Sequence, residues 1–381
     1  MKRILSCILL CLFCLTAWAQ QTVSAHVVDS ETGEALPYVR LYLPNGRGTL
    51  TNQDGDFLVS GESDEIVAIS YIGYEKISIR LADIPHVLRM KPLTKTLKEV
   101  VVLPVNYRRL IDQLKSDYKK AKNKQRVYFY RSLFRSPEGT ELIEAFMKAY
   151  SVINLRQPML LSGIQGIDSL GAESAMTLTA SNIQKQLGLA PKTFATPYWD
   201  QTIKPMKSLS TTKKYYDVFS SLIKEKDGTE IIRLDYKWNE KFTEKIGSTR
   251  YLEGTLYVDA RTYRLLRFDG DVGNMFQWVN LEREPSTMHI HMDYDYSHGY
   301  AEVADISIQG GNGQMSYRTL VFGVNDQELL EGGGDGVDED LVSAVNRAGY
   351  DSTLWVKHEH EIVKRTREEE KAISDESEGT E

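Results

Sequence analysis

The sequence contains little cysteine, and its three cysteines, Cys7, Cys11 and Cys14, all lie close to the N-terminus. If that first stretch is removed, the remaining chain carries no thiol. Disulfides, thiol nucleophiles and thiolate metal sites are then excluded. A chain of this length can rely on its hydrophobic core in place of covalent cross-links.

Long hydrophobic runs are also scarce, and only residues 1–19 contain one. There Lys2 and Arg3 precede an apolar run, and an Ala-Trp-Ala triplet precedes the expected cut, which is typical of a secretory signal peptide. A lipoprotein signal is the less favoured alternative, because Phe13 precedes Cys14 where that signal needs a small residue. We therefore expect an exported protein whose mature chain has no transmembrane segment.

Positive charge is in deficit, with 46 Lys and Arg against 53 Asp and Glu and a formal net charge of −7. No basic stripe offsets this balance, so nucleic acid is excluded as a partner. The contents of 41% hydrophobic and 26% charged residues are those of a soluble globular protein. The length of 381 residues predicts two domains.

Residues 20–92 consist of short runs rich in Val, Ile and Tyr, separated by Gly, Pro, Asn and Asp. This pattern predicts a small antiparallel β-sandwich. In the segment TNQDGDF, we expect a hairpin turn in which Asn52 and Asp54 accept backbone hydrogen bonds and Gly55 takes a positive φ.

The same oxygen-rich segment raises the alternative of a calcium site. A calcium loop of the EF-hand type places its glycine after alternating acidic residues, with a glutamate six residues further on. Here Gly55 stands between Asp54 and Asp56. That spacing does not fit the loop, and the turn is the favoured interpretation.

The first domain resembles a known family through the pattern GxxxDxxTGExLPxVxxYxPNxxGTxTNxDGxF, followed by ISYIGY and LxEVVV. The pattern is similar to the carboxypeptidase-like regulatory domain, with Ala25 in place of its leading glycine. The matching residues are Asp29, Thr32, Gly33, Glu34, Leu36, Pro37, Thr49, Thr51, Asn52, Asp54, Gly55, Phe57, Ser70, Tyr71, Gly73, Tyr74 and 97–102.

This resemblance implies an Ig-like or prealbumin-like β-sandwich. It also implies a Bacteroidetes cell envelope, because such domains begin many exported proteins there, including outer-membrane receptors. We accordingly expect the mature chain in the periplasm or associated with the outer membrane. The resemblance implies no reaction.

Residues 93–125 are expected to form a linker and then a helix, since apolar residues recur at helical intervals within 104–125. Residues 126–350 are predicted to form a larger α+β domain, with an irregular segment at 156–214. Seven runs of alternating polarity between 215 and 323 predict one large curved antiparallel sheet. Segment 139–155 suits neither a strand nor a helix cleanly.

Two further resemblances concern the second half. Residues 251–270, YLEGTLYVDARTYRLLRFDG, resemble the bent sheets of periplasmic lipoprotein-carrier proteins, and we expect a tight turn at 259–262. Residues 351–381 resemble the terminal segment of uncharacterised Bacteroidetes proteins. Within them Thr366 and Glu369 form a capping box, so that a short helix is expected from Arg367, before an acidic tail.

Histidines are the first candidates for chemistry. His289, His291, Asp293 and Asp295 alternate along a predicted strand, and such a row is able to bind zinc. The favoured interpretation is that the intervening apolar residues face the core while the polar row meets solvent. A metal site here is the alternative.

A second candidate is the segment KHEHE, in which His358 and Glu361 have the HxxE spacing of a zinc carboxypeptidase and His360 lies between them. Such an enzyme needs a third histidine far downstream, and no histidine follows Glu361. We therefore disfavour zinc carboxypeptidase activity and assign no metal ligand.

Other catalytic patterns are missing or unspecific. No GxSxG elbow and no phosphate-binding loop occur. The acidic loop at 331–341 is interpreted as solvated rather than calcium-binding. A pair of carboxylates of the glycosidase kind stays open, since their separation exists only in three dimensions. Trp199, Trp278 and Trp355 lie outside clear strands and are hypothesised to be interface anchors.

These observations predict a mainly β, non-catalytic binding or accessory protein of the cell envelope. We assign no catalytic residue, no metal and no cofactor, and leave the ligand-binding residues unknown. The expected partner is a cell-envelope protein or a small apolar or carbohydrate ligand. The alternatives are a periplasmic carrier of an apolar ligand and, less favoured, a metal-dependent hydrolase. An outer-membrane receptor is disfavoured because the chain is too short for a large barrel.

Overall fold

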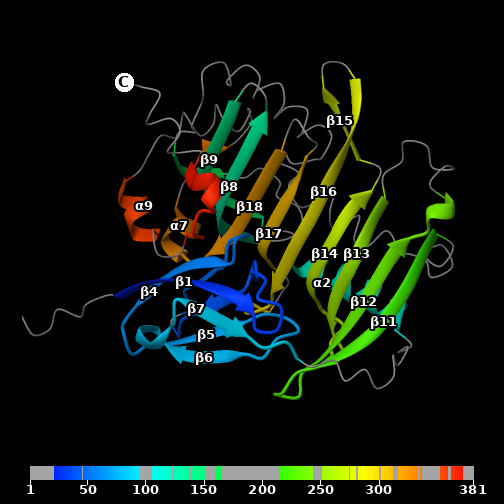
Figure 1. Cartoon of the computed structure of the whole chain (residues 1–381), viewed down its shortest axis with the longest axis horizontal. Coiled ribbons are helices and arrows are strands. Elements are labelled where there is room, and N and C mark those ends of the chain that lie inside the picture. Colours follow the sequence, from blue (N-terminus) through cyan, green and yellow to red (C-terminus); the bar gives the residue numbers. More distant parts are fainter. Residues whose placement is uncertain are drawn as a thin grey trace, which may run out of the picture. The chain divides into compact units, whose positions relative to one another are not determined.

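The computed structural model of the chain divides into two compact units, Met1–Leu93 with Lys357–Thr366 and Thr94–Val356 with Arg367–Glu381 (Figure 1). The structure describes residues 21–44, 46–93, 105–121, 124–136, 139–150, 159–164, 215–242, 251–273, 275–279, 282–299, 302–311, 316–332, 335–336, 352–358 and 362–371. The expected signal peptide lies outside these ranges. Among the described residues, no helix combines the length and the apolar composition that crossing a membrane requires.

The first unit contains the expected sandwich of two sheets. One sheet has the order β4-β1-β7 and the other the order β3-β2-β5-β6. The bounds are β1 (Gln21–Asp29), β2 (Arg40–Tyr42), β3 (Gly48–Leu50), β4 (Asp56–Gly61), β5 (Ile66–Ser70), β6 (Ile77–Arg80) and β7 (Val87–Met90), with a 3-10 turn at Leu81–Asp83. All neighbouring strands are antiparallel except β1 and β7, which run parallel.

The core of the sandwich follows directly from the alternation of the sequence. Along β5, Val67 and Ile69 are fully buried while Ile66 and Ala68 are exposed. From the other sheet, Val27 and Phe57 are completely shielded from solvent and belong to the same cluster. Burial of such side chains contributes roughly 1.5–3 kcal/mol each relative to exposure, before the entropy of ordering the chain is subtracted.

The segment TNQDGDF is a turn, as predicted, but it does not form a hairpin. The Oδ1 atom of Asn52 accepts hydrogen bonds from the amides of Asp54 and Asp56 at 3.0 and 2.9 Å. Gly55 has a φ of +82°. The flanking strands β3 and β4 belong to different sheets, so that the turn carries the chain from one sheet to the other. The hairpin prediction was wrong because a local turn does not specify which strands pair.

A second polar contact ties two of the motif loops together. Asp29 accepts hydrogen bonds from the amides of Glu31 and Thr32 through Oδ1 and from the hydroxyl of Tyr74 through Oδ2. These bonds, led by the Thr32 amide, hold the pKa of Asp29 below its usual range. Asp29, Thr32 and Tyr74 therefore have a structural role in the sandwich.

The C-terminal segment Lys357–Thr366 belongs to the same compact unit as the sandwich. The side-chain amide of Asn52 donates a hydrogen bond of 2.9 Å to the carbonyl of Arg365. Lys364 Nζ lies 3.0 Å from Ser24 Oγ. Asn52 thus serves both the turn and the C-terminal segment, although 313 residues separate it from Arg365.

The second unit is built on one 12-stranded sheet, confirming the prediction of a mainly β protein with a large antiparallel sheet. Its order is β11-β12-β13-β14-β16-β17-β18-β8-β9-β10-β19, with β15 pairing to β16. The bounds are β8 (Gln125–Ser136), β9 (Gly139–Tyr150), β10 (Met159–Ile164), β11 (Tyr216–Lys224), β12 (Glu230–Trp238), β13 (Tyr251–Asp259), β14 (Leu265–Gly273), β15 (Met275–Val279), β16 (Glu282–Asp295), β17 (Glu302–Gly311), β18 (Ser316–Val324) and β19 (Asp335–Gly336).

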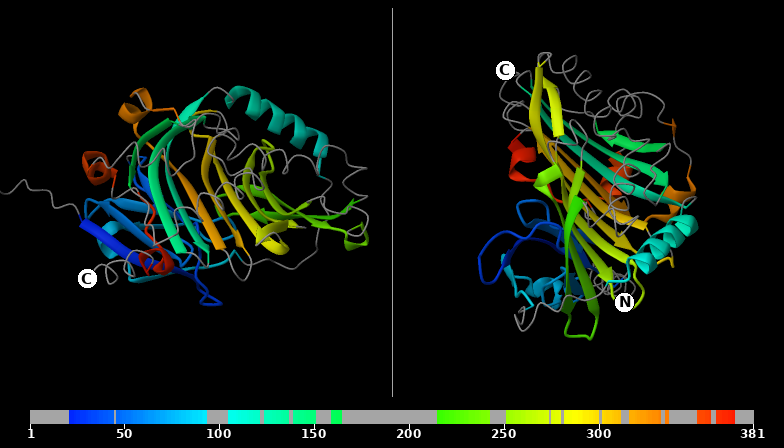
Figure 2. Two further views of the ribbon diagram at one scale, coloured as in Figure 1. Left: turned by 90° about the horizontal axis from the view of Figure 1, so that it is seen from above. Right: turned by 90° about the vertical axis from the view of Figure 1, so that its right-hand side faces the viewer.

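The seven alternating runs predict the strands of this sheet well. They correspond to β11–β14 and β16–β18, which follow one another in space as they do in the sequence, joined through β14 and β16. The described part of the ambiguous segment, 139–150, is strand β9, which pairs with β8 over its whole length. At the predicted tight turn, Asp259 Oδ1 accepts hydrogen bonds from the amides of Arg261 and Thr262. Figure 2 shows that the sheet is curved.

The predicted helix is also present, as α2 (Tyr107–Ala121). It buries Leu110, Leu114 and Ala121, the apolar residues at helical spacing. Arg109 connects it to the β13–β14 turn, where its guanidinium lies 4.4 Å from the ring of Tyr263. Figure 2 shows α2 lying across one side of the sheet. The shorter helices are α7 (Gln327–Glu331), α9 (Ser352–His358) and residues 367–371.

The register gives the sheet two different faces. One face carries an apolar row in which Leu234, Leu256, Phe268 and Met292 are buried on four neighbouring strands. Because side chains alternate, the residues between them point to the opposite face. That face, the polar face, carries charged residues such as Asp235 on β12, Asp269 on β14 and His291 on β16.

We expect Asn52→Ala to lower the free energy of unfolding of the first unit by roughly 2 kcal/mol, since it removes three hydrogen bonds at a buried position. Asp64→Ala, at an exposed turn position, should change it by less than about 0.5 kcal/mol. Urea denaturation followed by circular dichroism measures both. Equal effects of the two substitutions would contradict the role given to Asn52.

Candidate functional site

Two rows of paired residues cross the polar face of the sheet. In the first row, Asp235, Thr255, Asp269 and His291 are direct neighbours on β12, β13, β14 and β16. The next row along these strands is Arg233, Tyr257, Arg267 and Asp293. Direct cross-strand neighbours lie close enough for their side chains to interact. The sheet register thereby brings acids and bases from four strands together.

The innermost group of these residues is a buried ion-pair network. Arg267 donates two hydrogen bonds to Asp293, from Nε at 2.7 Å and from Nη2 at 2.9 Å. His291 lies between two carboxylates, with Nδ1 2.5 Å from Asp269 Oδ1 and Nε2 3.4 Å from Asp293 Oδ2. Two cations and two anions thus balance within the network.

The network changes the proton affinity of its members. Burial by itself would lower the pKa of His291, but the carboxylates of Asp269 and Asp293 outweigh it and raise the pKa to about 9. For Asp269, burial would raise the pKa, yet His291 and Arg267 hold it below its usual range. His291 is therefore an imidazolium at neutral pH. In that form it has no lone pair to offer a metal ion or to accept a proton as a base.

The prediction that the polar row of β16 meets solvent was wrong for its inner members. His291 is 1% exposed and Asp293 is 3% exposed, and the residues that alternate with them on the other face, Ile290 and Met292, are buried as well. Both faces of this strand are thus covered. The alternation predicted solvent exposure for this row, because a sequence pattern does not reveal that His291 and Asp293 each have a partner of opposite charge on β14.

The outer members of that row are accessible. The side chain of His289 is 38% exposed, and its Nδ1 lies 2.9 Å from Oδ1 of Asp271, which is itself largely exposed. Asp295 is partly exposed and lies 3.7 Å from Arg126. One strand therefore carries a buried, charge-balanced pair and an accessible histidine two residues away.

A second buried group lies where β8 meets the C-terminal helix. Arg131 Nε donates to Glu144 Oε1 on β9 at 2.6 Å, and its Nη1 lies 3.5 Å from Oε2 of Glu369. All three side chains are at most 4% exposed. The helix begins at Arg367, as the Thr366–Glu369 pattern predicts.

Glu368, the residue before the buried Glu369, forms a second group of ion pairs that is partly exposed. Arg135 Nη1 donates to Glu368 Oε1 at 2.7 Å, and Arg318 Nη2 lies 3.1 Å from Oε2 of the same carboxylate. Arg135 is on β8 and Arg318 on the neighbouring strand β18. We call Arg135 and Arg318 the arginine pair.

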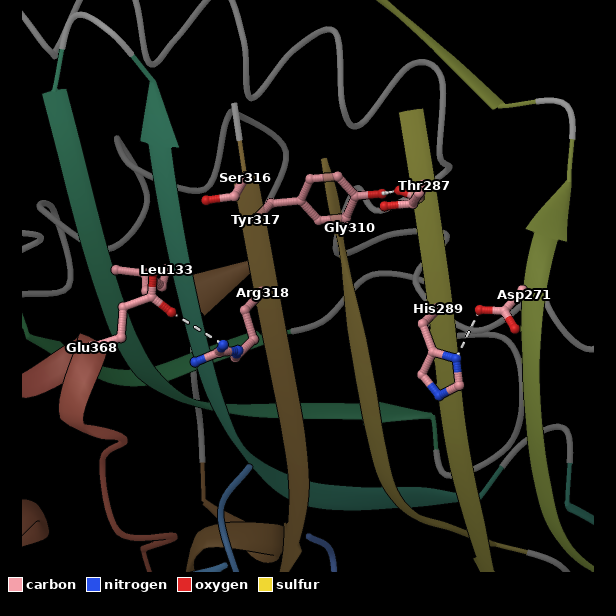
Figure 3. A pocket seen from close by; sticks show the side chains of 9 residues that line it. All are labelled: Leu133, Asp271, Thr287, His289, Gly310, Ser316, Tyr317, Arg318 and Glu368. Atoms are coloured by element: carbon pink, nitrogen blue, oxygen red, sulfur yellow. Dashed lines mark hydrogen bonds and ion pairs between the residues drawn. The ribbon is translucent and has the colours of Figure 1, made fainter. Parts of the chain in front are cut away.

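A trough of about 380 Å³ lies beside the arginine pair, across the ends of β16, β17 and β18. Figure 3 shows the Glu368–Arg318 ion pair on one side of it and the His289–Asp271 pair on the other. The lining residues are Leu133, Asp271, Thr287, His289, Gly310, Ser316, Tyr317, Arg318 and Glu368. Most of them offer hydrogen-bond donors or acceptors.

The trough is suited to binding a polar molecule. Its charged members are held in ion pairs, and the Tyr317 hydroxyl donates to the carbonyl of Thr287 at 3.3 Å. The hydroxyl of Thr287 donates to the carbonyl of Gly311 at 3.2 Å. In Figure 3 Ser316 lies apart from His289. A serine nucleophile needs a base within hydrogen-bond reach, so this arrangement presents contacts for a ligand instead.

The other residues singled out in the sequence have different surroundings. His358 is buried, whereas His360 and Glu361 lie outside the described residues. No three His, Asp or Glu side chains gather in metal-binding geometry within the part of the chain that the structure describes. Of the acidic loop, the structure describes residues 331–332 and 335–336.

The hypothesis that Trp355 is an anchor of an interface was wrong. Its side chain is buried, with ring centroids 4.8 Å from Phe146 and 6.1 Å from Phe129. It belongs to the core of the second unit. Trp278 belongs to strand β15, so the expectation that it lies outside the strands was wrong. Its side chain and all of Trp199 lie outside the described structure.

Five charged residues of these groups were not predicted from the sequence, namely Arg131, Arg135, Arg267, Arg318 and Glu368. The signal that was available is an arginine at inward positions of an otherwise aromatic strand, as in RVYFYRSLFR. Charged residues are almost never fully buried unless paired. Such a pattern therefore indicates an ion pair across the sheet, even when the partner is unknown.

Comparison with known proteins identifies the first unit. Residues 23–102 match the model of the CarboxypepD_reg-like domain, confirming the resemblance found in the sequence for this part of the chain. A stretch of 90 residues is 32% identical to the TonB-dependent receptor SusC of Bacteroides thetaiotaomicron. That stretch is 23% of this chain and only 9% of SusC.

Similarity to solved structures is distant. A DUF1329 family protein from Desulfovibrio piger aligns over 59% of this chain and 97% of its own, with 9% identity and a TM-score of 0.23. The complex of MucA and MucB from Pseudomonas aeruginosa aligns over 64% of this chain and 97% of its own, with 9% identity and a TM-score of 0.16. At such scores neither alignment carries an argument about this chain.

The pKa of His291 leads to a prediction of pH-dependent stability. Because the folded-state value of about 9 exceeds the usual 6.5, protonation of His291 stabilises the fold fully below about pH 6.5. The stabilisation is lost as the pH rises through 9. We expect His291→Gln to lower the free energy of unfolding at pH 6, with the difference from wild type shrinking towards pH 9.5.

Urea denaturation at a series of pH values measures this difference. The control is His298→Gln, at an exposed turn position, which should follow the wild-type pH dependence. A difference between His291→Gln and wild type that is constant from pH 6 to 9.5 would show that His291 is not charged in the folded protein.

Arg131 should be far more important for stability than Arg135. Arg131→Met leaves Glu144 and Glu369 buried without their cation, and breaking a buried pair in this way costs roughly 3–5 kcal/mol. Arg135→Met removes a partly exposed pair and should cost about 1 kcal/mol or less. Denaturation midpoints report both. Similar losses for the two variants would refute the distinction.

Proposed function

We propose that this protein is a non-catalytic binding protein of the cell envelope that holds a polar ligand in the trough of its large sheet. The observation that carries the proposal is the trough itself, with accessible ion pairs on two sides and hydroxyl groups between them. Pockets that recognise polar molecules use a small number of well-positioned polar groups of this kind.

The ion-pair network of the polar face supports a binding role over a catalytic one. A general base needs a pKa near the working pH and a lone pair to accept a proton. His291 is an imidazolium between two carboxylates and meets neither condition. The same charge state argues against the metal-dependent hydrolase, because zinc binds neutral imidazole.

The first unit supports a location in the cell envelope. Its family match and its similarity to a segment of SusC, a TonB-dependent receptor, agree with a domain of exported proteins. In this proposal the sandwich is a docking or stabilising module, and the mature chain resides in the periplasm or beside the outer membrane. Its motif residues Asn52, Asp29 and Tyr74 maintain turns, which fits a module without its own chemistry.

The trough favours a carbohydrate or a peptide over an apolar ligand. Asp271, His289, Arg318 and Glu368 would contact water when the trough is empty and would need polar partners when it is filled. Sugars and peptide backbones supply donors and acceptors along their whole length. An aliphatic ligand would exclude water from these ion pairs without supplying donors or acceptors in its place. The carrier of an apolar ligand therefore stays the less favoured alternative.

The test is titration calorimetry of the purified mature chain against neutral oligosaccharides, uronic-acid oligosaccharides and short polar peptides. At least one class should bind, and His289→Ala should weaken that binding roughly threefold to tenfold, as expected for one lost hydrogen bond. His298→Ala removes an exposed histidine from the β16–β17 turn and is the matched control. Failure of every class to bind, or equal losses for both variants, would overturn the proposal.

A further inference from the structure

Glu368 occupies the arginine pair in the manner of a bound carboxylate. Each of its two oxygens faces a different arginine, Arg135 at 2.7 Å and Arg318 at 3.1 Å. The two arginines project from neighbouring strands, whose register pairs Arg135 with Ser316, two residues from Arg318. Figure 3 shows Glu368 reaching over the strands to Arg318 at the side of the trough.

The contact with Glu368 is of the kind that exchanges easily. The side chains of Arg135, Arg318 and Glu368 are 34%, 21% and 36% exposed. Ion pairs in contact with water contribute little to stability, because solvent competes for both partners. A carboxylate from solution can therefore replace that of Glu368 at small cost.

The neighbouring residue keeps the helix in place when Glu368 moves. Glu369 is buried and lies 3.5 Å from the fully buried Arg131. Thr366, at the start of the helix, is buried as well. Rotation of the Glu368 side chain away from the arginines needs no displacement of this helix. The C-terminal segment thus combines a fixed glutamate with an adjustable one.

The arginine pair offers more hydrogen-bond donors than Glu368 uses. Glu368 contacts both guanidinium groups, so that its rotation makes room for another carboxylate at both arginines. In addition, the buried Nε of Arg135 has no hydrogen-bond acceptor among the described residues, so that Glu368 uses only part of its guanidinium group.

We propose that the arginine pair is the binding site for a carboxylate of the ligand, and that Glu368 occupies it in the unliganded protein and is displaced on binding. The proposal rests on the proposed function, since the rest of the ligand lies along the trough towards His289. A carboxylate forms bidentate hydrogen bonds with arginine and is recognised more strongly than a hydroxyl. Acidic peptides and uronic-acid sugars both carry this group.

The experiment uses the full mature chain and two acidic probes, digalacturonic acid and an N-acetylated tripeptide containing glutamate. Each is compared with its uncharged counterpart, the neutral disaccharide and the glutamine peptide. Glu368→Gln removes the competing charge and should tighten binding of one acidic probe roughly twofold to fivefold, the scale of an exposed ion pair. Glu370→Gln, an exposed position of the same helix, is the control and should leave binding unchanged.

Arg318→Met should abolish binding of the acidic probe, and its folding is checked by circular dichroism. The gain from Glu368→Gln guards against misfolding as an explanation, because a damaged protein does not bind more tightly. The acidic probe whose affinity rises in Glu368→Gln shows whether the carboxylate of the ligand belongs to a sugar or to a peptide.

The outcomes separate this inference from the proposed function. If a neutral probe binds as tightly as its acidic partner, or if Glu368→Gln leaves affinity for the acidic probes unchanged or weaker, the inference is overturned while the polar binding site stands. If no probe binds to either the wild type or Glu368→Gln, the inference and the proposed function fall together.

Discussion

The pairing of buried charges across neighbouring strands is the constraint on which the large sheet of the second unit depends. An unpaired ion inside a sheet would cost several kcal/mol, whereas a hydrogen-bonded pair of opposite charges offsets most of its own desolvation. Arg267 and Asp293 meet this condition between β14 and β16, and Arg131 and Glu144 meet it between β8 and β9. A shift of one strand by a single residue would point these side chains to the apolar face. The buried ion pairs therefore help to specify the register of the strands.

The same polar face changes in character from its centre to the ends of its strands. At the centre, His291 and Asp293 are buried, and the carboxylates of Asp269 and Asp293 raise the pKa of His291. Two residues along β16, His289 is accessible and belongs to the trough. A rigid charged interior next to adjustable surface groups is a suitable platform for recognition, because ligand contacts gain from groups that are already oriented. The pair Glu369 and Glu368 repeats this division within one helix, one glutamate buried and the other exchangeable.

In the first unit the family pattern describes structure. Asn52 holds the inter-sheet turn and the C-terminal segment, and Asp29 joins two loops through Tyr74. These roles were predictable in part, because Asn and Asp before a glycine indicate a turn. The partner of Asn52 at Arg365 was not predictable, since a contact between residues so far apart leaves no local pattern. The parallel pairing of β1 and β7 was missed for the same reason.

The sequence by itself determined the local elements. Alternation of apolar and polar residues located strands β11–β14 and β16–β18. Helical spacing located α2, and Thr366 with Glu369 located the last helix. These features depend on neighbours in the chain, which the sequence displays directly. Only the tertiary structure decided that His291 is buried and charged, that Trp355 belongs to the core, and that Arg135, Arg318 and Glu368 meet beside a trough. Burial and proton affinity depend on which strands lie side by side, and that choice is made by packing over the whole sheet.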